Sequence, residues 1–328
     1  MDKNEVERIL GKKTIIELMP IKVKKVDKSD KICYFFDTDA NASPFDINMA
    51  YDAGFDIVVP VSKMSAEQVP KLVQDAIFSR KPGAPTTFFI GGSDVKEGEK
   101  IAKQVIKSLV NPFECPVIID PRGSHTTASA VVAMTMNIAK KKHGMDLKGK
   151  KVAIFGAGPV ARIAAILAGK LGCDTYIVET WDKSTKQFVD NLANELIQEA
   201  GDKAAKITGV FAPEPQQRFE IANKVDIIWS LAAAGVEVLS EELMKKLKGK
   251  KLVVDINLVP PYGIEGLKPK HKNEEIYPGI FGIGALALGA LKANSESEIL
   301  KEAANTKGSK VFDFNYAFET AKRLLEKA

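Results

Sequence analysis

The chain has 328 residues, of which 45% are hydrophobic and 27% charged, and its 47 Lys and Arg against 42 Asp and Glu give a net charge of +5. These ordinary globular values exclude disordered, collagen-like and fibrous coiled-coil chains, and the length predicts about two domains. Two Leu-Lys-Gly-Lys-Lys turns, at residues 147–151 and 247–251, each precede an apolar run. Because no aromatic residues are interleaved with the basic ones, we expect solvated connections and small anionic ligands rather than nucleic acid.

The three cysteines and three histidines are scattered, with no C-x-x-C pair and no metal-ligand spacing. We therefore expect neither a disulfide nor a bound metal. The charged start, residues 1–5, is not followed by an apolar core, which argues against a secretory signal and predicts a cytoplasmic protein. The longest apolar stretch, residues 278–291, contains four glycines and is too short to span a membrane.

Apolar runs alternate with helical patterns along most of the chain, which is typical of parallel sheets flanked by helices. In the first half we expect strands at residues 32–36, 56–60, 86–90 and 117–119, with helices beginning near Ser43, Ser65 and Asp94. At the first of these starts, Ser43 is a capping residue, Pro44 suits the first turn and Asp46 follows three residues on. A longer helix, about residues 126–142, then leaves this unit.

Gly144 and the basic turn after it mark the start of a second unit, with strands expected at residues 152–155, 175–178, 207–210, 225–229 and 252–255. The remaining pattern is helical, over about residues 291–304 and 316–327, and we expect these helices to pack back on the first unit. The predicted fold is therefore α/β with two α/β domains. Residues 1–143, completed by helices of residues 292–328, form an N-terminal parallel-sheet substrate domain, and residues 144–291 form a Rossmann dinucleotide-binding domain.

The strand at 152–155 is followed by a G-x-G-x-x-A dinucleotide fingerprint. It consists of Gly156, Ala157, Gly158, Pro159, Val160 and Ala161. The first glycine permits the tight turn, the second lets the backbone approach a pyrophosphate, and the alanine allows close helix–strand packing beneath a helix N-terminus that attracts anions. We predict that these residues bind a dinucleotide; the alternative is a glycine-rich turn without a ligand.

An acidic residue at the end of the next strand supports this prediction. Glu179 lies 23 residues after Gly156, close to the usual spacing of about 20. Its carboxylate would accept hydrogen bonds from a ribose diol and repel a 2′-phosphate, and Thr180 and Trp181 follow in place of an arginine. We therefore expect NAD to be preferred, with NADP still possible; the alternative is a solvated acid.

The loops after the fourth and fifth strands are also expected to line the cofactor crevice, because loops at carboxyl ends of parallel strands do so. The residues concerned are Ser230, Ala232 and Asn257, whose amide we expect to meet the nicotinamide. Small residues at such places can also serve packing alone.

Several segments together resemble the bacterial NAD(P)-dependent methylene-tetrahydromethanopterin dehydrogenases and, less closely, the NADP enzyme that accepts methylene-tetrahydrofolate. The segments are residues 43–50, 52–55, 73–80, 120–121 with 123–124 and 126–127, 259–261 with 263–264, and 282–287. The resemblance runs from about residue 32 to the C-terminus. His125 departs from it, in a position we associate with Phe or Asn, and the first ~30 residues are an extension.

The resemblance implies oxidation of 5,10-methylene-tetrahydromethanopterin to the methenyl cation, with hydride passing to NAD(P), in one-carbon (formaldehyde) metabolism. It also implies a homo-oligomer with the substrate between the two domains. When hydride leaves, the neighbouring nitrogen lone pair stabilises the cation, so neither a base nor a metal is required. Lys292 matches a catalytic lysine that orients the pterin carbonyl; the alternative is a solvated helix lysine.

Further substrate contacts are expected at the ends of the first domain's strands. Asp46 would pair with the donor edge of the pterin, or serve only as a helix-capping acid. Gly91, Ser124, His125 and Thr126 would rim the pterin pocket, or mark ordinary helix starts. Two other functions stay open: a methylene-tetrahydrofolate dehydrogenase, and an NAD-binding redox sensor without turnover.

Overall fold

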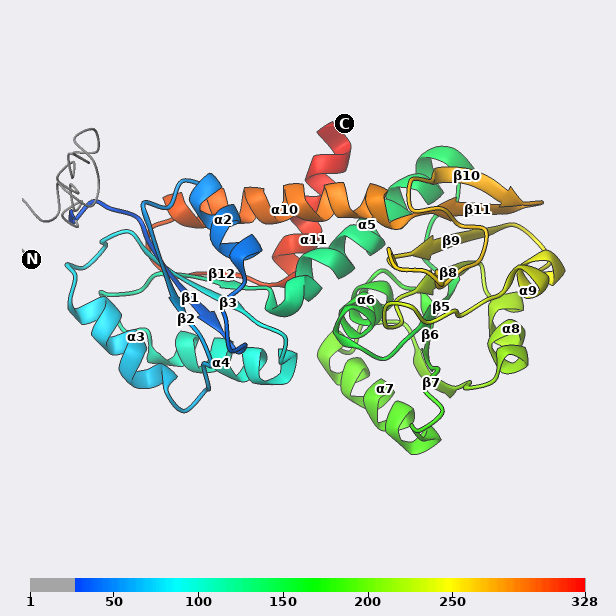
Figure 1. Ribbon diagram of the computed structural model, residues 1–328, viewed down its shortest axis with the longest axis horizontal. Coiled ribbons are helices and arrows are strands. Elements are labelled where there is room, and N and C mark those ends of the chain that lie inside the picture. Colours follow the sequence, from blue (N-terminus) through cyan, green and yellow to red (C-terminus); the bar gives the residue numbers. More distant parts are fainter. Residues whose placement is uncertain (1–26, 328) are drawn as a thin grey trace, which may run out of the picture.

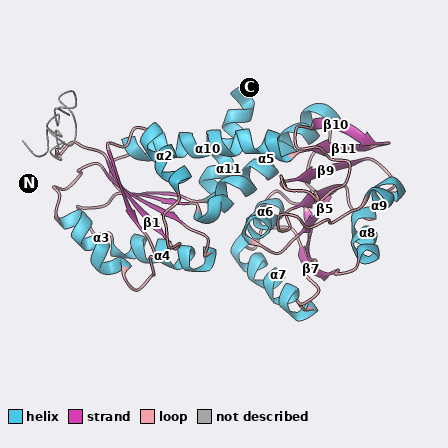
Figure 2. Cartoon of the chain, viewed as in Figure 1, coloured by secondary structure: helices cyan, strands magenta, loops and turns pink. Residues whose placement is uncertain are grey.

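A computed structural model describes residues 27–327, so most of the expected N-terminal extension lies outside the described residues. The chain forms two sheets, each with helices on both faces, and long helices run between them (Figures 1 and 2). The predicted α/β class with two parallel-sheet units is confirmed.

The first sheet has the strand order β12-β4-β3-β1-β2, and all its pairs are parallel. Its strands are β1 (Ile32–Asp37), β2 (Ile57–Val61), β3 (Thr86–Gly91), β4 (Pro116–Ile119) and β12 (Lys310–Phe312). The helices α2 (Pro44–Asp52), α3 (Val69–Phe78) and α4 (Val95–Ser108) connect the first four strands. All six residues of β3 are buried, as expected of a central strand covered on both faces.

The second sheet has the order β10-β11-β9-β8-β5-β6-β7 and is parallel except for the β10–β11 pair. Its strands are β5 (Lys151–Phe155), β6 (Asp174–Glu179), β7 (Ile207–Phe211), β8 (Ile227–Ser230), β9 (Lys251–Asp255), β10 (Lys272–Tyr277) and β11 (Ile280–Ile283). Its helices are α6 (Pro159–Lys170), α7 (Lys186–Ala200), α8 (Pro215–Asn223) and α9 (Glu241–Lys246). The strand order reverses at β5, where open α/β sheets bind their ligands.

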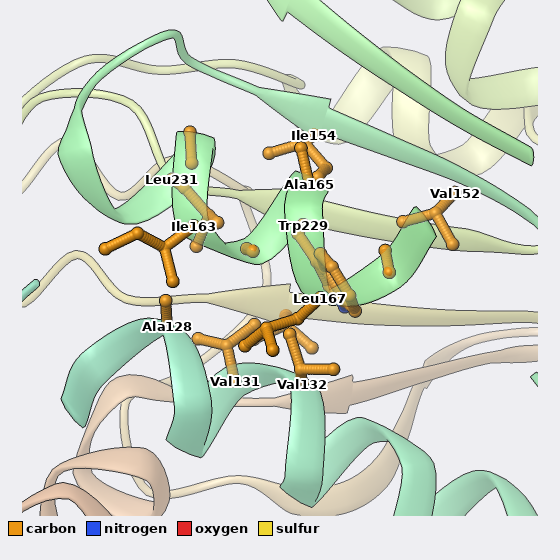
Figure 3. Close-up of a cluster of buried hydrophobic side chains, with 14 of the residues drawn as sticks. Ala128, Val131, Val132, Val152, Ile154, Ile163, Ala165, Leu167, Trp229 and Leu231 are labelled. Atoms are coloured by element: carbon orange, nitrogen blue, oxygen red, sulfur yellow. The ribbon is translucent and has the colours of Figure 1, made fainter. Parts of the chain in front are cut away.

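Two helices run in opposite directions between the sheets. After a short 3₁₀ turn (Pro121–Gly123), α5 (Ser124–His143) leads from the first sheet to the second, and α10 (Ala285–Asn305) leads back (Figure 1). The last helix, α11 (Phe314–Lys327), packs against α5. Figure 3 shows Val131 and Val132 of α5 facing Leu167 of α6 and Trp229 of β8 in one shared core. The sheets are therefore joined by packed helices rather than by a linker.

The structure differs from the sequence prediction at several boundaries. The helix expected from Ser65 begins at Val69, because Pro70 is tolerated only in a first turn. Strand β11 extends to Ile283 and the chain becomes helical at Ala285, so α10 passes through the expected boundary at 291–292 without a break. The edge strands β10 and β12 were missed, because one is mostly charged and the other has three residues. None of the helices within residues 27–327 is both long and apolar enough to cross a membrane.

Candidate functional site

The glycine turn after β5 is held by its neighbours on both sides. Gly156 has a φ of +120°, and a Cβ there would lie 2.6 Å from the carbonyl oxygen of Leu231. Its N–H donates to the carbonyl of Val178 at 2.8 Å. Only glycine fits this backbone, because the conformation and the close approach each exclude a side chain. The turn is thereby fixed beside the end of β6.

Gly158 differs from Gly156, because a Cβ at this position would meet no atom within 4 Å. Gly158 precedes α6, which begins with Pro159 and has no side-chain cap at its N-terminus. The N–H groups of Val160 and Ala161 precede the first hydrogen bond of the helix, which the Arg162 N–H donates to the Gly158 carbonyl at 3.0 Å. They lie at the positive end of the helix dipole. Ala161 is fully buried, which allows α6 to pack closely. These features fit the pyrophosphate of a dinucleotide.

The side chain of Glu179 lies at the end of β6, next to the strand that carries the glycine turn. It is buried, and its Oε1 accepts the backbone N–H of Trp181 at 2.8 Å. The half-buried Thr180 lies between them. The indole of Trp181 is 61% exposed. A carboxylate and a flat, exposed apolar ring therefore lie two residues apart at the end of this strand.

Ser230 and Asn257 have their polar groups engaged within the protein. The buried carboxylate of Asp255 forms a hydrogen bond with the Ser230 side chain and accepts the N–H of Asn257 at 3.0 Å. The Asn257 amide donates to the carbonyl of Pro261 at 3.0 Å and accepts the N–H of Val259 at 2.9 Å. These contacts favour a role in shaping the loop.

Ala232 is half-buried, and its backbone lies against Gly156. Of the three residues expected after the fourth and fifth strands, it is the one in contact with the glycine turn.

In the first domain, Asp46 and Gly91 lie side by side at the carboxyl edge of the sheet. The Ser43 hydroxyl accepts the N–H of Asp46 at 3.3 Å, so the expected helix cap is present. The Asp46 carboxyl group also forms a hydrogen bond with the Ser43 side chain and, when one of the two acids is protonated, with Glu296, and a Cβ on Gly91 would lie 3.7 Å from its Oδ2. Burial raises the pKa of Asp46, opposed by the Ser43 hydrogen bond and the charge of Lys292. Asp46 is therefore more than a capping acid.

The Lys292 side chain is 18% exposed and forms an ion pair with Glu296, one helical turn further along α10. Its Nζ lies 4.7 Å from the centre of the Phe45 ring. Burial alone would lower the pKa of Lys292, but the charges of Glu296 and Asp120 outweigh it and raise the pKa. Lys292 is therefore a held, charged ammonium and not a solvated lysine.

The start of α5 is organised by the carboxylate of Asp120, which accepts the N–H of His125 at 2.8 Å and of Thr126 at 3.2 Å. The Thr126 hydroxyl donates to the same carboxylate at 2.6 Å, and the Ser124 hydroxyl donates to the carbonyl of Pro121 at 2.6 Å. Ser124 and Thr126 are buried. For these two residues the structure favours the helix-start alternative.

One cavity of about 990 Å³ connects the two domains. Its lining includes His125 at the start of α5 and Ala157, Gly158 and Pro159 at the start of α6. Of the expected substrate residues, His125 lines this cavity with the glycine turn, whereas Asp46, Gly91 and Lys292 are not among its lining residues.

Sequence reasoning did not select Phe45, Asp120 or Glu296 as site residues. Glu296 had a usable signal, because an acid four residues after a lysine on a helix is placed to pair with it. Within residues 27–327, no group of three or more His, Cys, Asp or Glu side chains is arranged to hold a metal ion. The three cysteines are buried free thiols.

Comparison with known proteins gives consistent matches. Residues 44–122 match the family model described as methylene-tetrahydromethanopterin dehydrogenase, N-terminal. The chain is 33% identical over 283 residues to the NAD(P)-dependent methylenetetrahydromethanopterin dehydrogenase of Methylorubrum extorquens, covering 85% of this chain and 93% of that protein. It is 31% identical over 305 residues to the bifunctional protein MdtA of the same organism, covering 90% and 99%.

Among solved structures, an NAD-dependent malic enzyme of Thermotoga maritima is similar, with a TM-score of 0.51, 13% identity and coverage of 98% of this chain and 99% of that chain. Ornithine carbamoyltransferase of Pyrococcus furiosus has a TM-score of 0.52, 12% identity and coverage of 84% and 83%. At these identities the likeness concerns the fold alone.

The two glycines of the turn provide a matched test of the dinucleotide site. Gly158→Ala should leave the unfolding temperature unchanged, because the new methyl group meets no protein atom. It should raise KM for the dinucleotide about 10-fold, because forcing a methyl group against a bound group costs about 1–3 kcal/mol. Gly156→Ala is the control and should lower the unfolding temperature. Unchanged dinucleotide binding by a folded Gly158→Ala protein would place the pyrophosphate elsewhere.

Proposed function

The chain belongs to the family of NAD(P)-dependent methylene-tetrahydromethanopterin dehydrogenases, and we propose that it transfers hydride from the methylene carbon of 5,10-methylene-tetrahydromethanopterin to a nicotinamide dinucleotide, giving the methenyl cation. The observation that carries this proposal is the pairing of a glycine turn and open helix N-terminus in the second domain with the buried Asp46, Lys292 and Glu296 of the first domain and α10. Hydride transfer requires the two reacting carbons about 3–3.5 Å apart. Each sheet carries one of the two proposed ligand sites at the carboxyl end of a strand, the glycine turn after β5 and Gly91 at the end of β3.

The second domain supplies the cofactor half of the site. The backbone at Gly158 and the N-terminus of α6 would hold the pyrophosphate, and Glu179 would accept the hydroxyls of the adenosine ribose. The exposed ring of Trp181 offers an apolar surface beside that ribose. When bound, the nicotinamide supplies the hydride acceptor. The protein's own contribution is to fix its position.

The first domain and α10 supply the substrate half. The Asp46 carboxylate suits the N–H donors of a pterin edge, and the Lys292 ammonium suits its carbonyl oxygen. Their separation is held by Glu296, which contacts both side chains. We assign Lys292 an orienting role and not that of a base, because loss of hydride from the methylene group releases no proton. We also propose a cytoplasmic homo-oligomer, from the sequence features and the family resemblance.

The proposal for the cofactor is that NAD is preferred over NADP. Glu179→Ala should lower the ratio of kcat/KM for NAD to kcat/KM for NADP by about 10- to 150-fold, because it removes charged hydrogen bonds worth about 1.5–3 kcal/mol and the repulsion of a 2′-phosphate. Initial rates with both cofactors measure this ratio. If the ratio stays at the wild-type value, Glu179 does not contact the ribose.

The proposal for Lys292 is tested by comparison with another lysine on α10. Lys292→Ala should lower kcat/KM for the methylene substrate by about 10- to 1000-fold, the effect of one well-placed charged contact, and leave KM for NAD nearly unchanged. Lys301→Ala is the matched control, because this lysine side chain is half-exposed and its ion pair with Glu298 is loose, with 3.9 Å between Nζ and Oε1. A change within twofold at Lys292 would remove it from the site.

The function as a whole is tested by measuring NADH or NADPH formation against the concentration of each methylene pterin. We expect saturation with methylene-tetrahydromethanopterin and a much lower kcat/KM with methylene-tetrahydrofolate. The reverse preference would identify the folate enzyme. Dinucleotide binding without turnover of either substrate would identify a redox sensor.

A further inference from the structure

Two buried side chains near the substrate half each hold a polar atom without a hydrogen-bond partner in the described part of the chain. These atoms are Nδ1 of His125 and Oε1 of Glu296. The residues are only 5% and 3% exposed. An unpaired buried polar atom destabilises the fold, and such atoms are normally met by another group or by an ordered water.

Both residues line one small internal cavity of about 10 Å³. Asp120, Thr126 and Asp313 also contribute to its lining, and apolar side chains complete it. The volume is about what one water molecule requires, and a buried water typically makes about three hydrogen bonds. The cavity therefore matches a single water in both size and polarity.

We propose that this cavity is a water site and that its water joins Nδ1 of His125 to Oε1 of Glu296. The other oxygen of Glu296 pairs with Lys292, so His125 becomes a positioning residue that acts on Lys292 through Glu296. The inference rests on the proposed function in one respect, because Lys292 must belong to the substrate site for the link to affect turnover.

The charges around this link come from several elements. Glu296 faces Lys292 on its own helix, Asp46 on α2 and Asp120 after β4. His125 faces Asp120 and Asp313, which lies between β12 and α11. Burial lowers the pKa of His125, so its ring is neutral at neutral pH and can carry its one proton on Nδ1.

The direction of the effect follows from the hydrogen bonds. A His125 ring that donates to the water lets the water donate to Glu296, which favours the ionised carboxylate. Burial raises the pKa of Glu296 to about 8, opposed by the charge of Lys292. Loss of the water link would raise this pKa further. The carboxylate, and with it the ion pair to Lys292, would then form only at higher pH.

The test uses His125→Phe in the full-length enzyme. The acid-side midpoint of kcat/KM for methylene-tetrahydromethanopterin at saturating NAD should rise by about one pH unit, equivalent to one hydrogen bond. Infrared titration of the Glu296 carboxyl, identified by difference from Glu296→Gln, should show the same rise without any turnover. His125→Asn, whose amide N–H can take the place of Nδ1, should restore both midpoints.

His143→Phe is the matched control, because this histidine lies at the other end of α5 and is bonded to Asn273 at 2.6 Å. It should move neither midpoint. An infrared midpoint unchanged by His125→Phe, or a high-resolution crystal structure without a water between the two side chains, would overturn the proposal. An infrared shift alongside a Lys292→Ala enzyme of normal activity would instead support the water link and refute the assignment of Lys292.

Discussion

The burial of α5 between the two sheets is the constraint on which the geometry of the site depends. Its residues Val131 and Val132 are fully buried against the second sheet's helix and strands. Thr135 of the same helix accepts the indole N–H of Trp229 at 3.1 Å. At its N-terminus, beside the first sheet, the backbone N–H of His125 donates to the carboxylate of Asp120. Because α5 is packed along this length, it sets the distance between the two halves of the cavity.

The sequence of α10 places the Lys292–Glu296 ion pair between the two domains. Leu288 and Leu291 belong to the core shared with the second sheet, and Ile299 and Leu300 belong to a core of the first. Lys292 and Glu296 lie between these two apolar stretches. A polar turn in the middle of an otherwise packed helix is expensive to bury unless its groups are paired. The pairing of Lys292 with Glu296 meets that requirement and fixes the ammonium.

The sequence predicted the parts of the structure that depend on local patterns. The central strands were visible as apolar runs, and the glycine turn and Glu179 were visible by spacing within one βαβ unit. The edge strand β10 was not, because its sequence is largely charged and it is held by pairing with β11. Strand β11 lies in a glycine-rich segment whose sequence does not predict a strand. A Cβ on Gly284 would clash with backbone from residues 268 and 269, a contact no local pattern reveals.

Among the site residues, too, local sequence patterns were predictive and contacts made by tertiary packing were not. Asn257 was expected to face the cofactor because it follows a strand end, which is a local observation. Its amide is bonded to Pro261 and Val259, so hydrogen bonds within the loop orient the side chain, and its contact with the nicotinamide stays a prediction. For Glu296, the spacing from Lys292 indicates a pair on one helix, but local sequence does not show that this pair is buried in the site. The burial of Glu296 and its contact with Asp46 arise only when α10 packs against α2.

The charges at the substrate half suit a reaction that ends in a cation. The methenyl product carries a positive charge that the methylene substrate lacks, and like charges about 4 Å apart near a protein surface repel by about 4 kcal/mol. An isolated ammonium at Lys292 would therefore oppose the reaction that it helps to orient. Asp46, Asp120 and Glu296 surround this ammonium, and each offsets its charge when it is ionised. In the proposed site, these acids in their ionised forms would attract a charge that develops only as hydride leaves, and would therefore lower the energy of the transition state more than that of the bound substrate.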